Sequence, residues 1–169
     1  MYLRIKGVTL IELIIVMALV AILAGVVSFT FAVGLKTWGS GRNRAEIRQD
    51  GNLAMERMVR ELSQASGFTI ARDDKVKFSA DLDEDGEVES ITFDTSEDNL
   101  NRTVEDVAVC LARNVETFHL AYYDLNNDLL EPPVAPSERD NIRVITITLT
   151  MNKVDETISL SSSVYARNQ

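Results

Sequence analysis

The sequence has very few of the residues that build cross-linked or catalytic sites. Cys110 is the only cysteine and His119 the only histidine among 169 residues. One thiol excludes an intrachain disulfide and a cysteine-based zinc site. We expect Cys110 to be a small buried apolar side chain in a strand, and His119 to be a packed or exposed strand residue. The sequence also lacks a nucleophile elbow, a zinc motif and a glycine-rich phosphate loop, so we do not expect an enzyme.

Basic charge and proline are scarce as well. Residues 36–169 hold 15 basic and 25 acidic side chains, a net charge of −10. A region this acidic repels nucleic acid and bare anionic membrane surfaces, which excludes both as partners. No proline occurs before Pro132, so any bend in an N-terminal helix would have to come from glycine, at Gly25, Gly34 or within residues 39–41.

What the sequence does have is one long apolar run at the N-terminus. Residues 8–35 contain a single charge, Glu12, and the run exceeds the about 20 residues that cross the hydrocarbon core of a bilayer. Arg4 and Lys6 precede it, so the positive-inside bias places Met1 in the cytoplasm and the bulk of the chain outside. A secretory signal peptide and a generic single-pass anchor both fit this pattern. Neither explains an acidic residue inside the run.

The residues around Glu12 form a specific motif. They read Lys6-Gly7-Val8-Thr9-Leu10-Ile11-Glu12-Leu13. This segment resembles the prepilin signature of type IV pilins and type II secretion pseudopilins, in which a short basic leader and a glycine precede Thr-Leu-Ile-Glu-Leu. The resemblance implies that prepilin peptidase cuts between Gly7 and Val8, and that the new α-amino group of Val8 is methylated. It also implies that Glu12 pairs with the α-amino group of a neighbouring subunit. Val8 stands where phenylalanine or methionine is commoner.

The physical chemistry of Glu12 is consistent with that role. A carboxylate inside the membrane costs roughly 2.5–3.5 kcal/mol on insertion scales, less near the interface, and such a residue is by default functional. Pairing a buried carboxylate with a buried ammonium offsets much of both penalties. A pair that forms only at one axial offset between two subunits sets their register. The alternative is that Glu12 snorkels to the cytoplasmic headgroups.

Downstream of the apolar run the pattern predicts an α+β fold. A looser stretch at 34–41 includes Trp38, which suits the membrane interface. The helix then extends to about residue 66, with Gly67 as its C-cap, because one apolar face recurs at helical spacing. That face consists of Ile47, Ala54, Met58, Leu62 and Ala65.

Strands are predicted after Gly67, and the clearest is Ile145–Met151, where apolar residues alternate with threonines. Hairpin-like spacing predicts a mostly antiparallel sheet packed on the helix. The predicted strands are Phe68–Ala71, Val76–Ser79, Glu87–Phe93, Val115–Tyr123, Ile142–Met151 and Thr157–Tyr165.

An acidic loop is the candidate metal site. Asp81, Asp83 and Asp85, followed by Gly86, match the first half of a calcium-binding loop. Thr92 replaces the bidentate glutamate of the twelfth position, and no flanking helices are predicted, so the loop is not an EF-hand. Calcium binding and a plain acidic hairpin turn between two strands both remain open. No other cofactor is expected.

These features divide the chain into a leader at 1–7, a transmembrane and assembly helix at 8–35, and an extracytoplasmic pilin-like head at 36–169. The head segments FSADLDEDGEVESITFD, FHLAYYDLNNDLLE and IRVITITLT resemble minor pilins of the PilW kind and J-type minor pseudopilins. The resemblance implies a minor subunit of a type IV pilus or a type II secretion pseudopilus. Its partners would be prepilin peptidase, other pilins or pseudopilins, and the inner-membrane assembly platform. The alternative is an uncleaved single-pass membrane sensor or binding module; a membrane-anchored hydrolase has little support.

Overall fold

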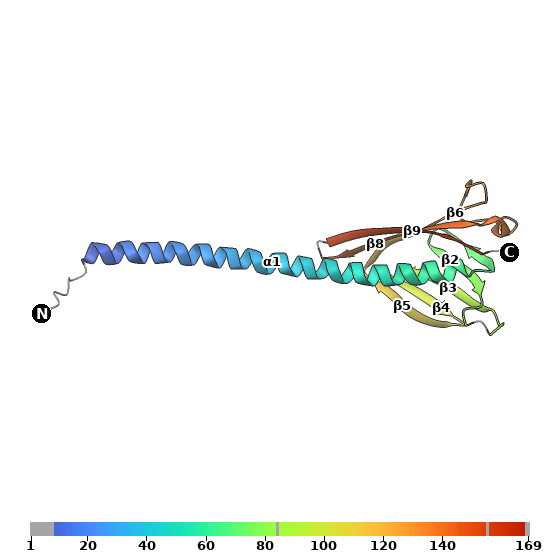
Figure 1. Cartoon of the computed structure of the whole chain (residues 1–169), viewed down its shortest axis with the longest axis horizontal. Coiled ribbons are helices and arrows are strands. Elements are labelled where there is room, and N and C mark those ends of the chain that lie inside the picture. Colours follow the sequence, from blue (N-terminus) through green and yellow to red (C-terminus); the bar gives the residue numbers. More distant parts are fainter. Residues whose placement is uncertain (1–8, 84, 155, 168–169) are drawn as a thin grey trace, which may run out of the picture. The chain divides into compact units, whose positions relative to one another are not determined.

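A computed structural model describes residues 9–83, 85–154 and 156–167. The chain opens with helix α1, Leu10–Ser63, and continues as β-strands with one short 3₁₀ helix, η1, Arg139–Asn141 (Figure 1). It divides into two compact units between Gly41 and Arg42, inside α1. Each unit is described separately below.

Helix α1 differs from the prediction at two places. The stretch 34–41 is helical throughout and not a looser segment, although each interior glycine costs about 1 kcal/mol relative to alanine. The helix ends at Ser63, and Gly67 opens a strand instead of capping the helix. The amides of Gln64 and Ala65 donate to carbonyls three residues back, at 3.1 and 3.2 Å. These bonds tighten the last turn and satisfy the carbonyl groups of Glu61 and Leu62, and the Ser63 hydroxyl donates to the Arg60 carbonyl, so the helix ends without a glycine cap.

In the second unit, α1 buries one face. The buried residues of the helix are Ile47, Gly51, Ala54, Met55, Met58, Glu61 and Leu62. All five members of the predicted apolar face, including Ala65 just beyond the helix, are buried, so that prediction is confirmed. At Gly51 the helix backbone comes close to the strands: an added Cβ would lie 2.7 Å from Leu160 Cδ1 and 2.8 Å from Met151 Sδ.

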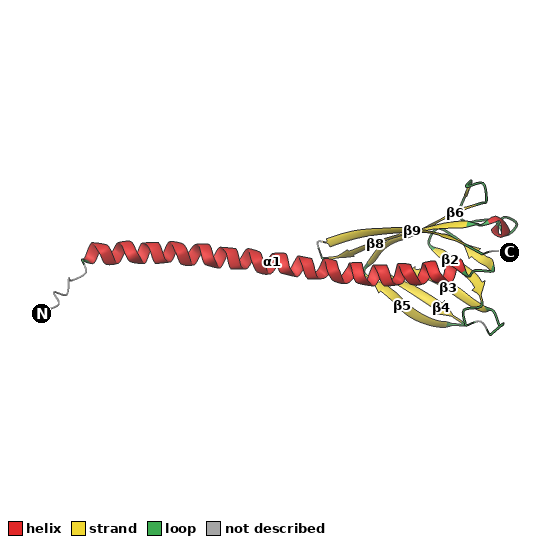
Figure 2. Cartoon of the chain, viewed as in Figure 1, coloured by secondary structure: helices red, strands yellow, loops and turns green. Residues whose placement is uncertain are grey.

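The strands form two antiparallel sheets (Figure 2). The first sheet has the order β1-β2-β3-β4-β5 and the second the order β7-β6-β8-β9. Strands of the first sheet are β1 Gly67–Ala71, β2 Lys75–Ala80, β3 Glu89–Ser96, β4 Asn99–Val104 and β5 Val107–Arg113. Strands of the second are β6 Val115–Tyr123, β7 Leu129–Leu130, β8 Val144–Lys153 and β9 Glu156–Tyr165.

The α+β prediction, a long helix packed on antiparallel strands, is confirmed. All six predicted strands are present, and β6 has the predicted bounds. Strands β4, β5 and β7 were not predicted, and the strands form two sheets instead of one.

Buried polar contacts join the second sheet to the β1–β2 turn. The Tyr122 hydroxyl donates to the Arg72 carbonyl at 2.8 Å, and the Leu120 amide donates to the Asp73 carbonyl at 2.7 Å. Burial raises the pKa of Tyr122 above its usual range, and the charges of Asp73 and Asp74 act in the same direction. The phenol therefore stays neutral and keeps this hydrogen bond at every physiological pH.

Candidate functional site

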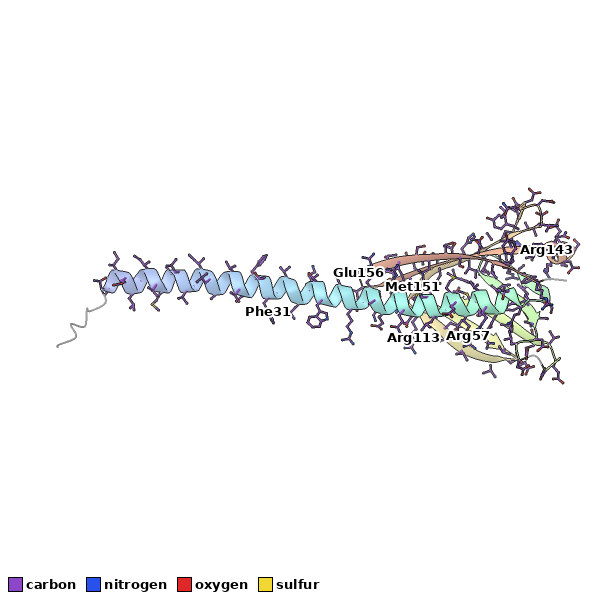
Figure 3. All side chains as sticks on the ribbon, in the orientation of Figure 1. Phe31, Arg57, Arg113, Arg143, Met151 and Glu156 are labelled. Carbon is purple, nitrogen blue, oxygen red and sulfur yellow. The ribbon has the colours of Figure 1, made fainter. Side chains whose placement is uncertain are left out.

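The first candidate site is the apolar segment of α1. In the described part of the chain, α1 is the helix whose length and composition suffice to cross a membrane: an 18-residue window reaches a mean hydropathy of 3.0, with none of it buried. Large apolar side chains stay exposed from Leu10 to Leu35, and Phe31 projects outward from the helix (Figure 3). Exposed apolar surface of this extent requires lipid or partner helices around it.

Glu12 lies in the first turn of α1, and its side chain is exposed. Its backbone amide donates to Thr9 Oγ1 at 3.3 Å. Thr9 directly precedes the first helical residue, so its hydroxyl caps one of the amides that the helix leaves unsatisfied. A threonine followed three residues later by glutamate is the sequence pattern of a capping box. The acidic residue that the motif requires thus also suits the helix start, because the positive end of the helix dipole favours a negative charge.

The predicted cleavage and methylation residues, Gly7 and Val8, lie outside the described residues, as does the rest of the predicted leader at 1–7. Their assignment therefore rests on sequence.

Residues 3–28 match the prokaryotic N-terminal methylation motif. This match supports a type IV pilin-like family. It includes Gly7, Val8 and Glu12 and ends within the apolar run, so it bears on the N-terminal segment and not on the head. No curated protein matches the sequence. The prepilin-type motif and the membrane-capable helix together fit a membrane-anchored pilin that is processed by prepilin peptidase and assembles with other pilins.

The structure brings the three predicted calcium ligands together. One carboxylate oxygen from each of Asp81, Asp83 and Asp85 lies within 4.8 Å of the other two. The loop connects the paired strands β2 and β3, as the hairpin interpretation predicts, and Gly86 has a φ of +89° that favours glycine. Within the described residues, Asp81 Oδ1 is buried without a hydrogen-bond partner.

Backbone amides donate a hydrogen bond to the carboxylate of each of these three aspartates. Asp81 Oδ2 accepts from the Gly86 amide at 3.1 Å, and Asp85 Oδ1 accepts from the Glu87 amide at 2.7 Å. Asp83 Oδ1 accepts from the Asp85 amide at 3.4 Å. The bonds of Asp83 and Asp85 span two residues, as in ordinary Asx turns, and the Asp81–Gly86 bond spans five. Thr92, at the twelfth position of the loop, is paired on both sides within the first sheet and supplies no carboxylate.

Cys110 and His119 form no site together. Cys110 lies on β5, at the edge of the first sheet, and His119 lies on β6 in the second sheet. Both side chains are exposed. The expectation for Cys110, a buried side chain, is therefore wrong. The reason is that the edge strand β5 is largely uncovered, with a burial pattern of four consecutive exposed residues.

Sequence reasoning missed a buried ion pair in the head. Glu61 of α1 is 3% exposed, and its carboxylate accepts from Arg102 Nε of β4 at 2.7 and 2.9 Å. Arg57, labelled in Figure 3, adds a bond to Glu61 Oε1 at 2.9 Å from one turn earlier. The available signal was the position of Glu61, seven residues after Ala54 and therefore on the buried face of the helix. Its partner lies 41 residues away and gave no signal.

Proposed function

We propose that the chain is a minor pilin or minor pseudopilin, a structural subunit of a type IV pilus or a type II secretion pseudopilus. The observation that carries the proposal is the methylation motif at residues 3–28, which overlaps the exposed apolar segment of α1 at 10–35, where Glu12 is the only charge. Assignment to a minor subunit rests on the resemblance of the head and on the lack of a cysteine pair that would close a C-terminal loop.

In this proposal the N-terminus stays cytoplasmic and the head extracytoplasmic until the assembly platform extracts the subunit from the membrane. Prepilin peptidase removes residues 1–7 and leaves Val8 with a methylated α-amino group. Glu12 then pairs with the α-amino group of a neighbouring subunit, because each charge is expensive in an apolar surrounding and the pair offsets both costs. The pair forms at one axial offset, which fixes the register of adjacent helices.

The chain acts by assembly and not by catalysis. Cys110 and His119 lie exposed on different sheets, so they offer no nucleophile and base in contact. In the described residues, the grouped acids Asp81, Asp83 and Asp85 occupy a hairpin turn and accept amide protons.

The decisive experiment is intact-mass measurement after co-expression with a prepilin peptidase. We expect a chain that has lost seven residues, begins at Val8 and carries one added methyl group. A bulky residue in place of Gly7 should block the cut, while Gly7→Ala should be cut at best in part. The alternative function, an uncleaved membrane sensor or binding module, predicts an intact N-terminus. A mature chain that begins anywhere other than Val8 would reject the proposal.

A further inference from the structure

The outer face of the second sheet has an unusual composition. On β8 the residues that point inward are Ile145, Ile147, Leu149 and Met151, all buried, and the intervening side chains point outward. We call the outward-pointing set the hydroxyl face. It consists of Thr117, His119, Ala121, Tyr123, Leu129, Val144, Thr146, Thr148, Thr150, Asn152, Thr157, Ser159, Ser161, Ser163 and Tyr165.

None of these residues is an aspartate, glutamate, lysine or arginine. Charged residues make up 25% of the chain, and residues 36–169 alone hold 25 acidic and 15 basic side chains. An ordinary solvated strand face would hold several of them, since charged residues are the ones most often exposed. The charges gather at the rim instead, for example Glu116 at the bulge in β6, and Glu156 where β9 begins (Figure 3).

Hydroxyl pairs run across β8 and β9. Thr146 and Ser163 lie 2.9 Å apart, oxygen to oxygen, and Thr150 and Ser159 lie 3.4 Å apart. A hydroxyl group is both donor and acceptor. A surface made of such groups is therefore complementary to an identical surface, which a surface of one charge sign is not.

One end of the hydroxyl face is apolar and aromatic. Cross-strand pairing places Leu129, Tyr123, Val144 and Tyr165 in a single row over all four strands. Leu129 is 56% and Tyr165 79% exposed. The core of a protein–protein interface is depleted in charged residues and serine and enriched in tyrosine, so this row is the part of the face that most resembles such a core. The serines beside it suit a contact of the antibody kind, in which serine and tyrosine occur together.

We propose that the hydroxyl face is a docking surface for a second copy of this chain. Two heads that each carry a charge of −10 repel one another wherever their acidic loops meet. The hydroxyl face removes that repulsion from the contact and offers matching donors and acceptors. A strongly charged partner would find no ion pair on it and would leave the hydroxyl groups poorly matched.

The size of the face predicts a weak contact. Three strands, each about 4.8 Å wide, and five cross-strand rows about 6.6 Å apart cover roughly 15 by 30 Å, or about 1,000 Å² over both copies. This is close to the lower limit for a specific interface, about 1,000 Å². Two copies would therefore pair mainly where a shared membrane raises their effective concentration.

The symmetry of such a pair keeps the two heads parallel to one another. Strands β8 and β9 run alongside the second half of α1 within the same unit (Figure 1). A two-fold axis parallel to these strands stacks the two faces, and the part of α1 within each head then points the same way. The pairing does not depend on cleavage or on filament assembly, so it goes beyond the proposed function and can fail or hold separately.

Cysteine cross-linking of the full chain in membranes, without prepilin peptidase, tests the proposal. In a Cys110→Ser background, Thr146→Cys and Thr150→Cys place a thiol on β8, the strand nearest the two-fold axis, and Thr95→Cys places one on an exposed part of β3 as the matched control. On mild oxidation we expect disulfide dimers from the two face positions and few from the control. Dimer yields no higher than the control, or cross-links to a different protein alone, would overturn the proposal.

A charge swap identifies the partner as a second copy. In the Thr146→Cys chain, Thr148→Glu or Thr148→Lys alone should remove most of the dimer, because two like charges then face each other. Mixing the Glu and Lys chains should restore it. Because Thr148 is partly exposed, both variants should melt as the parent does, which circular dichroism would check. Undiminished dimer in either single variant, or no recovery in the mixture, would refute pairing through this face.

Discussion

Glu12 combines two properties that conflict in an isolated chain. Its backbone amide is capped by Thr9, and its carboxylate suits the first turn of a helix, both of which stabilise the start of α1. The same carboxylate destabilises insertion of that helix into lipid. A residue with a local benefit in the helix and a cost in the membrane is best explained by a partner that appears only when two subunits meet.

Glu12→Ala should separate these properties. Removing the charge favours membrane insertion, so cleavage and insertion of the precursor should persist. Assembly should fall sharply, because the neighbouring ammonium loses its partner. The measurement is the fraction of chain recovered in sheared filaments, with Glu12→Asp as the control that retains the charge. Normal incorporation of the alanine variant would contradict the pairing role.

Glu61 poses the opposite case, a charge buried in the head with its partners already present. Arg102 has a side chain only 12% exposed, so removing Glu61 would leave a buried guanidinium without its counter-ion. We expect Glu61→Gln to lower the free energy of unfolding by about 3 kcal/mol, the lower end of the cost of breaking a buried pair.

Arg57, the more exposed of the two arginines that pair with Glu61, provides the control. Arg57 is 41% exposed, so Arg57→Ala should cost less than about 1 kcal/mol. Replacing both buried partners, as in Glu61→Leu with Arg102→Met, should recover most of the loss, because no charge then stays unpaired. Chemical denaturation of the three variants would measure the order, and equal losses for Arg57→Ala and Glu61→Gln would contradict it.

Among the elements, strands with alternating patterns were predictable and the others were not. In β8 apolar and threonine residues alternate, and β6 repeats the pattern, so periodicity alone identifies both. β5 reads Val-Ala-Val-Cys-Leu-Ala-Arg without alternation, and its exposure depends on being an edge strand, which only the sheet order reveals. The exposed Cys110 follows from that position. β7 is two residues long and exists only through its pairing with β6.

The close approach of α1 to the strands at Gly51 is another feature that local sequence patterns do not predict. From the sequence alone, Gly51 would be expected only to weaken the helix. In the structure, the absence of a side chain at Gly51 leaves room for Leu160 and Met151. Gly51→Ala should lower the free energy of unfolding by about 1 kcal/mol, since overpacking costs 1–3 kcal/mol and the gain in helix propensity returns about 1 kcal/mol.

Gly39 provides the matched control for Gly51. An added Cβ at Gly39 meets nothing within 4 Å, so Gly39→Ala should not destabilise the chain. Combining Gly51→Ala with Leu160→Ala should cost less than the sum of the two single changes, because the shortened leucine makes room. Thermal unfolding of the full chain in detergent would measure all four, and a stabilising Gly51→Ala would show that the neighbouring side chains move aside freely.

At the scale of the whole molecule, the sequence predicted more of the N-terminal unit than of the head. In the N-terminal unit the described residues from Leu10 onward are helical, and residues 3–28 match the methylation motif independently of any tertiary contact. The head depends on long-range pairing. Its division into two sheets, its edge strands and the Glu61–Arg102 pair arise from contacts between distant segments, for which local patterns carry no signal.

A metal bound in the acidic loop at Asp81, Asp83 and Asp85 would stabilise the whole head. We expect the full chain in detergent to melt at the same temperature in calcium and in chelator. The carboxylates of the loop already accept hydrogen bonds from backbone amides, and the twelfth position holds Thr92 within the first sheet.

Asp83→Asn should raise the melting temperature slightly, since it removes one of three carboxylates whose oxygens lie within 4.8 Å of one another. A calcium site would instead stabilise the head by about 2.7 kcal/mol at a hundred times its dissociation constant. Such a rise in calcium, lost in a variant with Asp83→Asn and Asp85→Asn together, would show that the hairpin turn is a metal site.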